Sequence, residues 1–238
     1  FGTPDRALHH VAIVDEKVTE QLLYPEMVVF AELLRNKGIE VSIVSPEDIT
    51  IDDDGRLWTA TSPHVIDFLY NRLTDFRLKE ASNKHIREAA MAQTVVLSPH
   101  PAAYARIADK RILVTLGEEL RSRAARGEIP EGYANIIPRT IFMSEKSTEE
   151  WIGARKKWVF KPPAGNGSKG VYRGDRISVK KLKELPVERT LAQELCSPSV
   201  SADDGTKLDF RVFTTGTAVM GLASRHYSGQ VMEMRSEK

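Results

Sequence analysis

The sequence is poor in cysteine and in long apolar runs, and each shortage excludes a class of protein. Its 238 residues contain one cysteine, Cys196, which can form neither an internal disulfide nor a multi-cysteine zinc site. Because this cysteine usage fits a reducing compartment, we expect a cytoplasmic protein. No apolar run reaches the roughly 18 to 20 residues that cross a bilayer. The N-terminus does not show the pattern of a signal peptide, which is a basic start followed by an apolar stretch. We therefore expect no membrane partner.

Charge of one sign is also lacking. Lysine and arginine number 34 against 33 aspartates and glutamates, a formal net charge of +1. Without a global positive field, the chain is not expected to bind nucleic acid or an anionic membrane. The six histidines show no metal-ligand spacing, so a zinc site is not expected. The chain opens on Phe1 instead of Met, which indicates a fragment or a lost start.

The first third of the chain alternates patterns that are typical of strands and helices. Apolar runs of strand type occupy residues 10–14, 39–44, 65–70 and 94–97, and helical periodicities occupy residues 24–37 and 79–93. A turn at residues 52–55 is expected to lead into a small hairpin. Strands that alternate with helices predict an α/β domain with a mostly parallel sheet covered on both faces.

The pattern changes after Pro101. Expected helices occupy residues 102–108, 111–123, 147–154 and 179–185, and expected strands occupy residues 136–142, 157–161, 189–196, 208–213 and 217–223. This half therefore predicts an α+β domain with antiparallel strand pairs. We place the boundary near residues 100–108 and assign the domains to residues 1–107 and 108–238.

The most informative stretch is WVFKPPAGNGSKGVY, residues 158–172. An apolar strand delivers Lys161 to a glycine-rich loop that turns directly into a second strand. Gly165, Gly167 and Gly170 carry no side chains, so backbone N–H groups can approach an anion closely while Lys161 adds a positive charge. This arrangement predicts a phosphate site whose ligand is a nucleoside triphosphate.

The loop sequence GNGSKG also matches the glycine motifs of dinucleotide-binding proteins and protein kinases. The dinucleotide fingerprint needs a helix directly after its last glycine, whereas Val171, Tyr172 and Arg173 have a strand pattern. In kinases the phosphate lysine follows the loop, whereas Lys161 precedes it. What remains is a lysine on the incoming strand beside a glycine hairpin that covers the phosphates.

The order and spacing of several segments between residues 109 and 225 resemble the ATP-grasp superfamily. These segments are IIPRT, a short helix, WVFKPPAGNGSKGV, TLAQELC and LDFRVFTTGTAVMGLASR. Upstream, VIDFLYNRLTDFRL and SPHPAAYARIADKRIL are similar to the preceding domain of glutathione-synthetase-like members. The resemblance implies a substrate-side pre-ATP-grasp domain over residues 1–107. It also implies an α+β ATP-grasp domain with an antiparallel sheet over residues 108–238, incomplete at its C-terminus.

The resemblance implies nucleotide contacts for three groups of residues. Lys161 would contact the phosphates, as would Lys110 at the entry to the grasp domain. Loop residues would close over the phosphates, and a strand passing into a hinge would bind the adenine edge. The loop residues are Gly165, Asn166, Gly167, Ser168 and Gly170, and the hinge residues are Gln193, Glu194, Leu195 and Cys196. The alternatives are solvated surface lysines, a plain glycine-rich hairpin and an ordinary buried strand.

Catalytic and substrate contacts are implied at two further places. Arg225 resembles a catalytic arginine that steadies the transferred phosphoryl group, and Arg211 resembles a basic residue of the active-site cleft. An exposed strand face is the alternative for Arg211, because it alternates with apolar neighbours. Asn71 and Arg72, which follow an expected strand, and Arg77 are candidates for binding an anionic substrate, with a structural ion pair as the alternative.

The activity that the resemblance implies is ligation in two steps. ATP phosphorylates a substrate carboxylate, and an amine or another nucleophile then displaces phosphate from the acyl phosphate. The expected cofactors are ATP and Mg²⁺, the expected partners are small-molecule carboxylates and amines, and a homo-oligomer stays open. The family's acidic and asparagine metal ligands lie downstream of a position like Arg225. Since only Glu233 and Glu237 remain there, we assign no metal ligand.

Two other functions stay open. A nucleotide-binding module without ligase activity, such as a degenerate ATP-grasp domain, would fit the missing metal ligands. An ATP-dependent phosphotransferase would use the same nucleotide site but would pass the phosphate to a hydroxyl. The sequence carries no signature that identifies the carboxylate or the nucleophile.

Overall fold

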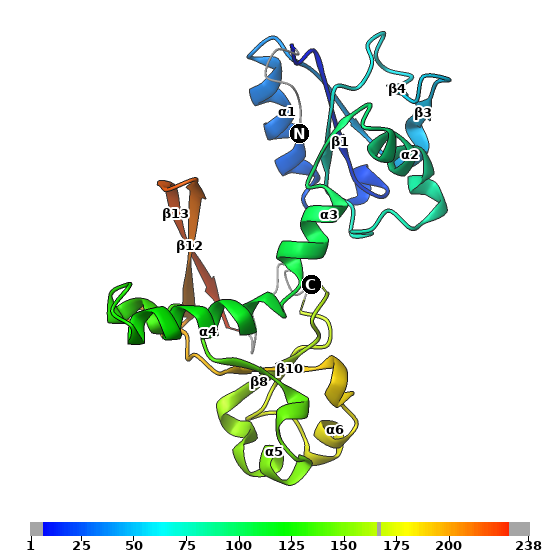
Figure 1. Cartoon of the computed structure of the whole chain (residues 1–238). Coiled ribbons are helices and arrows are strands. Elements are labelled where there is room, and N and C mark those ends of the chain that lie inside the picture. The colour runs from blue at the N-terminus through cyan, green and yellow to red at the C-terminus, as the bar shows by residue number, and fades with distance from the viewer. Residues whose placement is uncertain (1–6, 166–167, 229–238) are drawn as a thin grey trace. The chain divides into compact units, whose positions relative to one another are not determined.

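The structure is a computed structural model that describes residues 7–165 and 168–228. The chain divides between Ala108 and Asp109 into two compact units, which we call unit 1 and unit 2 in chain order (Figure 1). Within the described residues, no helix combines the length and the apolar character that a bilayer crossing requires.

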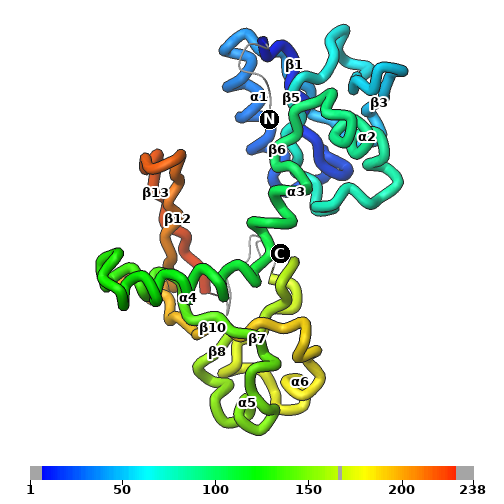
Figure 2. The backbone as a smooth tube through the Cα atoms, viewed as in Figure 1, coloured from blue at the N-terminus to red at the C-terminus, as the bar shows by residue number. Residues whose placement is uncertain are grey.

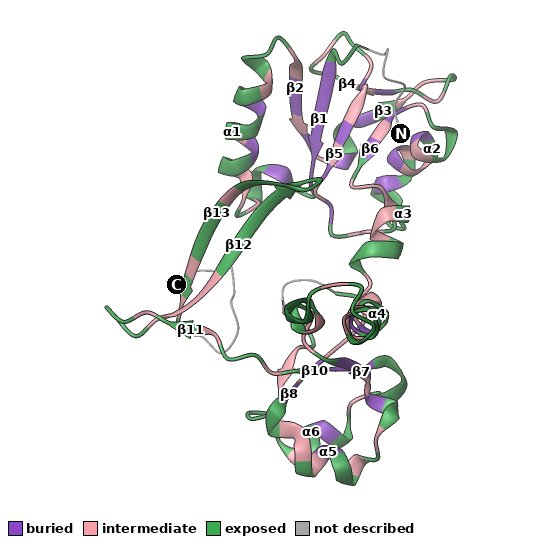
Figure 3. Ribbon diagram, turned by 60° about the vertical axis from the view of Figure 1, so that its left-hand side comes forward, coloured by how far each residue is buried: buried purple, intermediate pink, exposed green. Residues whose placement is uncertain are grey.

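Unit 1 is built on a parallel four-stranded sheet in the order β2-β1-β5-β6. Its strands are β1 (His10–Val14), β2 (Glu40–Val44), β5 (Phe68–Asn71) and β6 (Val96–Ser98). Every residue of β1 is buried, as Figure 3 shows, because both faces of the sheet are covered.

Two helices provide this cover. Val11 and Ile13 of β1 belong to one core cluster with α1 (Tyr24–Arg35), whereas Ala12 and Val14 belong to a second cluster with α2 (Lys84–Ala92). Since neighbouring residues of a strand point to opposite faces, the two helices cover opposite sides of the sheet. The predicted parallel α/β arrangement is therefore confirmed.

The remaining elements of unit 1 differ from the prediction at their ends. Strands β3 (Ile49–Ile51) and β4 (Leu57–Thr59) form an antiparallel hairpin. The strand expected from residue 65 begins at Phe68, because the N–H of Ile66 donates to the carbonyl of Leu57 at 2.8 Å and so continues the hairpin.

The helices next to these strands also begin or divide elsewhere than expected. The helix expected from residue 79 begins at Lys84, after Leu78 in a left-handed conformation (φ 51°) and a 3-10 turn at Ala81–Asn83. Helix α3 (Pro101–Ala103) continues into a π turn at Tyr104–Ala108, within the helix expected over residues 102–108.

Unit 2 contains an antiparallel four-stranded sheet in the order β7-β10-β8-β9, whose central strands are visible in Figure 2. The strands are β7 (Thr140–Phe142), β8 (Trp158–Lys161), β9 (Tyr172–Arg173) and β10 (Leu191–Glu194). The helices are α4 (Ile112–Ala125), α5 (Thr148–Ala154) and α6 (Val179–Lys183). These antiparallel pairs confirm the type of sheet predicted for the second half.

The core of unit 2 is organised by Trp151. Its ring packs edge-on against Trp158 and Phe160, with ring centroids 5.4 Å apart in each pair. Its indole N–H donates to the carbonyl of Met143 at 2.7 Å, so burial leaves no polar atom of the side chain unpaired. Helix α5 starts where predicted, because the Ser147 hydroxyl accepts the N–H of Glu150 at 3.3 Å. One face of β8 is therefore anchored in a packed core.

A third sheet consists of β11 (Ser199–Val200), β12 (Lys207–Thr215) and β13 (Ala218–Tyr227). Strands β12 and β13 extend further than the predicted runs. Apolar side chains of this hairpin are open to solvent, with Phe210 at 67% and Leu222 at 70% exposure, and Figure 3 shows most of it as exposed. Within the described residues, this sheet has no apolar cover comparable to the core that packs against β8.

Candidate functional site

Strand β8 carries Lys161 out of the core of unit 2. Trp158 and Phe160 are buried, so the alternating residues Val159 and Lys161 lie on the opposite face of the strand. They line a cavity of about 330 Å³, which we call the lysine cavity. Its other described lining residues are Lys110, Pro162, Gly165, Ser168, Lys169 and Val171. The described lining thus contains three lysines and no carboxylate.

A chain of hydrogen bonds across three strands holds the Lys161 ammonium. It donates to Oε1 of Gln193 on β10, whose Nε2 donates to the hydroxyl of Thr140 on β7 at 2.8 Å. Thr140 in turn donates to the carbonyl of Pro138 at 2.9 Å. Each partner is neutral, so Lys161 keeps its charge available for a ligand.

Burial is the main cause that lowers the pKa of Lys161, and the neighbouring positive charge of Lys110 adds to it. An anion bound beside Lys161 would relieve both effects, because it would compensate the buried charge and separate the two cations. The electrostatics of the cavity therefore favour a negatively charged ligand.

Lys110 reaches the same cavity from the turn before α4. Its Nζ donates to the carbonyl of Gly165 at 3.2 Å, and its backbone N–H donates to the carbonyl of Pro163 at 2.8 Å. The loop after β8 is thereby tied to the start of α4. Two lysines that are distant in the sequence consequently converge on one cavity.

The loop between β8 and β9 contains backbone conformations that glycine adopts more readily than other residues. Gly165 and Gly170 have positive φ angles of 141° and 73°, which side chains disfavour. A Cβ at Gly170 would also lie 3.4 Å from the ring of Pro162. Ser168 adopts a left-handed φ of 57° as well, and its carbonyl accepts the N–H of Val171 at 3.1 Å. Asn166 and Gly167 lie outside the described residues.

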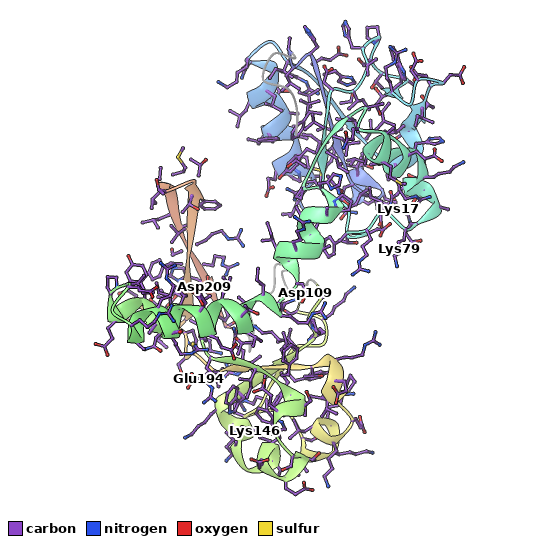
Figure 4. All side chains as sticks on the ribbon, viewed as in Figure 1. Lys17, Lys79, Asp109, Lys146, Glu194 and Asp209 are labelled. Atoms are coloured by element: carbon purple, nitrogen blue, oxygen red, sulfur yellow. The ribbon has the colours of Figure 1, made fainter. Side chains whose placement is uncertain are left out.

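The predicted adenine hinge spans the end of β10, where Glu194 is labelled in Figure 4, and the two residues that follow the strand. The N–H of Glu194 donates to the carbonyl of Arg139, and the N–H of Leu195 donates to the carbonyl of Lys157, each at 2.8 Å. Cys196 is exposed. An adenine edge would therefore have to use carbonyl groups or the N–H of Cys196, and the hinge role stays a prediction.

The two predicted catalytic arginines lie on the β12–β13 hairpin and not on the sheet of Lys161. Arg225 forms two hydrogen bonds with its cross-strand neighbour Asp209, at 2.6 and 2.7 Å, and this contact holds the pKa of Asp209 below its usual range. Arg211 is exposed and lies opposite Ala223. Of the predicted nucleotide residues, Lys110 and Lys161 thus line one cavity, and Gln193 accepts a hydrogen bond from Lys161. Arg225 is instead paired with Asp209.

Asn71 and Arg72, two of the predicted substrate residues of unit 1, have internal partners. Asn71 is 2% exposed, accepts the N–H of Leu73 at 3.0 Å and donates to the carbonyl of Pro99 at 3.3 Å. The Arg72 side chain is 14% exposed and pairs with Glu26 of α1 at 2.7 Å. These contacts match the structural alternative, and a role in substrate binding stays a prediction.

Sequence reasoning missed several residues around the cavities. In unit 2 these are Pro162 and Lys169, and Lys169 could have been found because it lies within GNGSKG. In unit 1 a cavity of about 760 Å³ is lined by Arg77, which was predicted to bind an anionic substrate, and by residues that were missed, including Lys17 and Lys79. Both lysines are labelled at the same end of unit 1 in Figure 4.

Comparison with family profiles and curated proteins assigns the chain to no family. The profile described as "Strictosidine synthase-like, N-terminal" matches residues 39–62 alone, which comprise β2 and the β3–β4 hairpin. None of the curated proteins compared with the chain matches it significantly.

Solved structures resemble the chain at low sequence identity. The ATP-grasp ligase PsnB complexed with its minimal precursor is 12% identical, with a TM-score of 0.49 over 94% of this chain and 78% of PsnB. Other PsnB structures are complexes with Mg and ADP or with AMPPNP. The D-cycloserine synthetase DcsG is 16% identical, with a TM-score of 0.43 over 78% of this chain and 59% of DcsG.

A candidate gamma-glutamylcysteine synthetase from Methylobacillus flagellatus KT has a TM-score of 0.57 at 14% identity, over 96% of this chain. The chain spans 65% of that protein. At this identity the likeness shows that the two proteins share a fold, and it leaves the activity of this chain to be argued from its own residues.

Proposed function

We propose that the chain is part of an ATP-dependent ligase and that the lysine cavity holds the phosphates of the nucleotide. The observation that carries the proposal is the meeting of Lys110 and Lys161 at one cavity, beside a glycine-rich loop and without a carboxylate among its described lining residues. Such surroundings offset the charges of a triphosphate without a competing anion.

The size of the lysine cavity fits the phosphate chain of a nucleotide, with the adenine bound outside the cavity. A volume of about 330 Å³ lies at the lower end of the pockets that hold small ligands, about 300 to 1,000 Å³. It suits a phosphate chain better than a whole nucleotide. The adenine would extend toward residues 193–196, because β10 pairs directly with β8 in the sheet.

In the proposed reaction, ATP gives its terminal phosphoryl group to a carboxylate, and an amine then displaces phosphate from the acyl phosphate. Lys110 and Lys161 bind the phosphates, and Gln193 orients Lys161 before the nucleotide arrives, which lowers the entropy lost on binding. The loop between β8 and β9 would cover the phosphates and limit the access of water to the acyl phosphate. Arg211 and Arg225 stay candidates for contacting the transferred phosphoryl group. To do so, Arg225 would have to give up its hydrogen bonds to Asp209.

Magnesium does not fit the described residues of this site. They contain no group of three or more histidine, cysteine, aspartate or glutamate side chains that could hold a metal ion, and the described lining of the lysine cavity is entirely without carboxylates. Hard cations such as Mg²⁺ need oxygen ligands. No step of the proposed reaction is therefore assigned to a metal bound by these residues.

The same observation favours a second candidate, a nucleotide-binding module that does not ligate. The two candidates differ in what the full chain does with ATP, a carboxylate pool and an amine pool. A ligase releases phosphate only when both pools are present. A module without ligase activity binds ATP and releases none under any of these conditions. Phosphate transferred to a product and not released would indicate a phosphotransferase.

Nucleotide binding itself is tested by Lys161→Ala in the full chain. Losing a charged hydrogen bond to phosphate costs about 1.5 to 3 kcal/mol, or about 10- to 150-fold in affinity for ATP by calorimetry. Lys180→Ala removes an exposed lysine of α6 outside the cavity and should leave the affinity unchanged. Equal affinities of the Lys161→Ala variant and the unaltered chain would contradict the proposed site.

A further inference from the structure

The sheet of unit 1 has a topological switch point beside its central strand. From β1 the chain passes to β2 on one side of it and then returns to β5 on the other side. The loops that leave the carboxyl ends of β1 and β5 consequently diverge. In open parallel sheets, a crevice forms at this place and is where ligands bind.

The cavity of about 760 Å³ lies in this crevice, and we call it the switch-point cavity. All of its described lining residues follow a strand of the sheet. Glu16 and Lys17 come after β1, Glu47 comes after β2, and the others come after β5. Those after β5 are Thr74, Asp75, Phe76, Arg77, Lys79, Glu80 and Ser82. The cavity is therefore a product of the sheet topology and not of one local motif.

The loop after β5 is held in place by the buried side chain of Leu78 and by hydrogen bonds to Asp75. Leu78 is 1% exposed although its backbone is left-handed (φ 51°), a conformation that costs energy in a residue other than glycine. Asp75 accepts the N–H of Glu80 at 2.8 Å and the side-chain amide of Asn83 at 3.0 Å. With Leu78 anchored in the core, its neighbours Arg77 and Lys79 are both exposed and line the cavity.

Charges of both signs surround the cavity. Lys17, Arg77 and Lys79 supply three cations, and Glu16, Glu47 and Glu80 supply three carboxylates besides Asp75. In the described part of the chain, the structure gives these six side chains no ion pair and no hydrogen bond. Both signs of charge are thus available to a ligand, whereas Asp75 is engaged in holding the loop.

We propose that the switch-point cavity binds a small zwitterion, namely a free amino acid or a short peptide. Its carboxylate contacts Lys17, Arg77 and Lys79, and its ammonium contacts Glu16, Glu47 and Glu80. A volume of about 760 Å³ is ample for a ligand of this size. A polyphosphate is disfavoured here, because the carboxylates would repel it. The proposal does not rest on the nucleotide site, since all of these residues belong to unit 1.

The test is calorimetric titration of the full chain, without nucleotide, with the proteinogenic amino acids and a set of dipeptides. At least one should bind. Its N-acetylated form and its C-terminal amide, each lacking one charge, should bind at least about tenfold more weakly, because each loses a charged hydrogen bond. Arg77→Ala and Glu47→Gln should each weaken the unmodified ligand at least about tenfold as well.

Lys37→Ala provides the matched control, because Lys37 is an exposed lysine of unit 1 that does not line the cavity. It should leave the affinity unchanged, and the thermal unfolding of all three variants should match that of the unaltered chain. Inorganic tripolyphosphate serves as the anionic probe. If no zwitterion binds at millimolar concentration, or if only tripolyphosphate binds in a manner sensitive to Arg77→Ala, the proposal is overturned.

Discussion

The lysine cavity of unit 2 and the switch-point cavity of unit 1 both gather cationic side chains, but from different kinds of backbone. In unit 2, one strand of an antiparallel sheet, the turn before α4 and a glycine-rich loop bring Lys161, Lys110 and Lys169 together. In unit 1, the loops after parallel strands bring together Lys17, Arg77 and Lys79. An antiparallel sheet in unit 2 and a parallel sheet in unit 1 thus each position three cationic side chains around a cavity.

The difference between the cavities lies in their negative charges. The described lining of the lysine cavity has no carboxylate, whereas that of the switch-point cavity has four. Cations without counter-charges suit a polyphosphate, and cations interleaved with carboxylates suit a ligand that carries both signs. Charge composition, more than size, therefore separates the two ligand classes, and the following changes should act on one cavity at a time.

Gly174→Ala should abolish the lysine cavity while sparing unit 1. A Cβ at this buried glycine would lie 1.8 Å from the carbonyl oxygen of Arg155 and 2.7 Å from that of Trp158. Since both are backbone atoms, β8 and β9 must separate, which should destabilise unit 2 by about 3 kcal/mol or more. Thermal unfolding should show this loss, together with a loss of ATP binding.

Gly153→Ala is the matched control for Gly174→Ala. It adds the same methyl group in helix α5, where nothing lies within 4 Å of the new Cβ. Helix propensity predicts a small gain in stability, up to about 1 kcal/mol. If both variants unfolded alike, close packing between β8 and β9 would not explain the shape of the lysine cavity.

Gln193→Ala should weaken ATP binding by less than Lys161→Ala does. It leaves the Lys161 charge in place but removes its neutral partner and the link to Thr140. A hydrogen bond of this kind contributes about 1 kcal/mol, so calorimetry should show a loss of about fivefold. An unchanged affinity would mean that Gln193 does not position Lys161. Affinity for zwitterions should be unaffected in either case.

Raising the pH should weaken ATP binding in the unaltered chain toward the level of Lys161→Ala. Burial and Lys110 lower the pKa of Lys161 in the folded protein, so its charge is lost at a lower pH than that of a surface lysine. The stability of unit 2 should follow the opposite trend, rising with pH between the lowered pKa and the ordinary lysine pKa, because the unfolded chain binds more protons there. Calorimetry and thermal unfolding over this range check the two signs, and parallel trends would contradict them.

Arg225→Lys should have the smallest effect. The pair with Asp209 is about one-third exposed, with side-chain exposures of 33% and 35%, and exposed ion pairs contribute about 0 to 1 kcal/mol. We expect a change of this size in the free energy of unfolding and none in ATP affinity. A tenfold loss of ATP affinity would contradict this expectation. It would show that Arg225 contacts the nucleotide, although it is not among the residues that line the lysine cavity.

Features encoded within a short stretch were predictable from the sequence. The apolar run that ends at Lys161 predicted a strand, and the glycines predicted the turn that follows it. The parallel sheet of unit 1 was predictable for the same reason, since alternating strands and helices imply it.

Features that depend on distant pairing were not predictable. The bond from Lys161 to Gln193 requires the register between β8 and β10. The switch-point cavity requires β5 to pair with β1. The strand expected over residues 65–70 ends at Asn71, within one residue of the prediction, but the pairing of Arg72 with Glu26 depends on how α1 packs on the sheet. Residue patterns show which side chains lie at the end of a strand. Only the folded structure shows which of them already have a hydrogen-bond or ion-pair partner.

The most direct test of the lysine cavity is hydrogen–deuterium exchange of the full chain with and without a non-hydrolysable ATP analogue. We predict slower exchange in residues 158–173, around Lys161 and its glycine-rich loop, and no change in residues 74–82 of unit 1. Binding of the analogue with unchanged exchange in residues 158–173, or failure of the analogue to bind at all, would contradict this prediction.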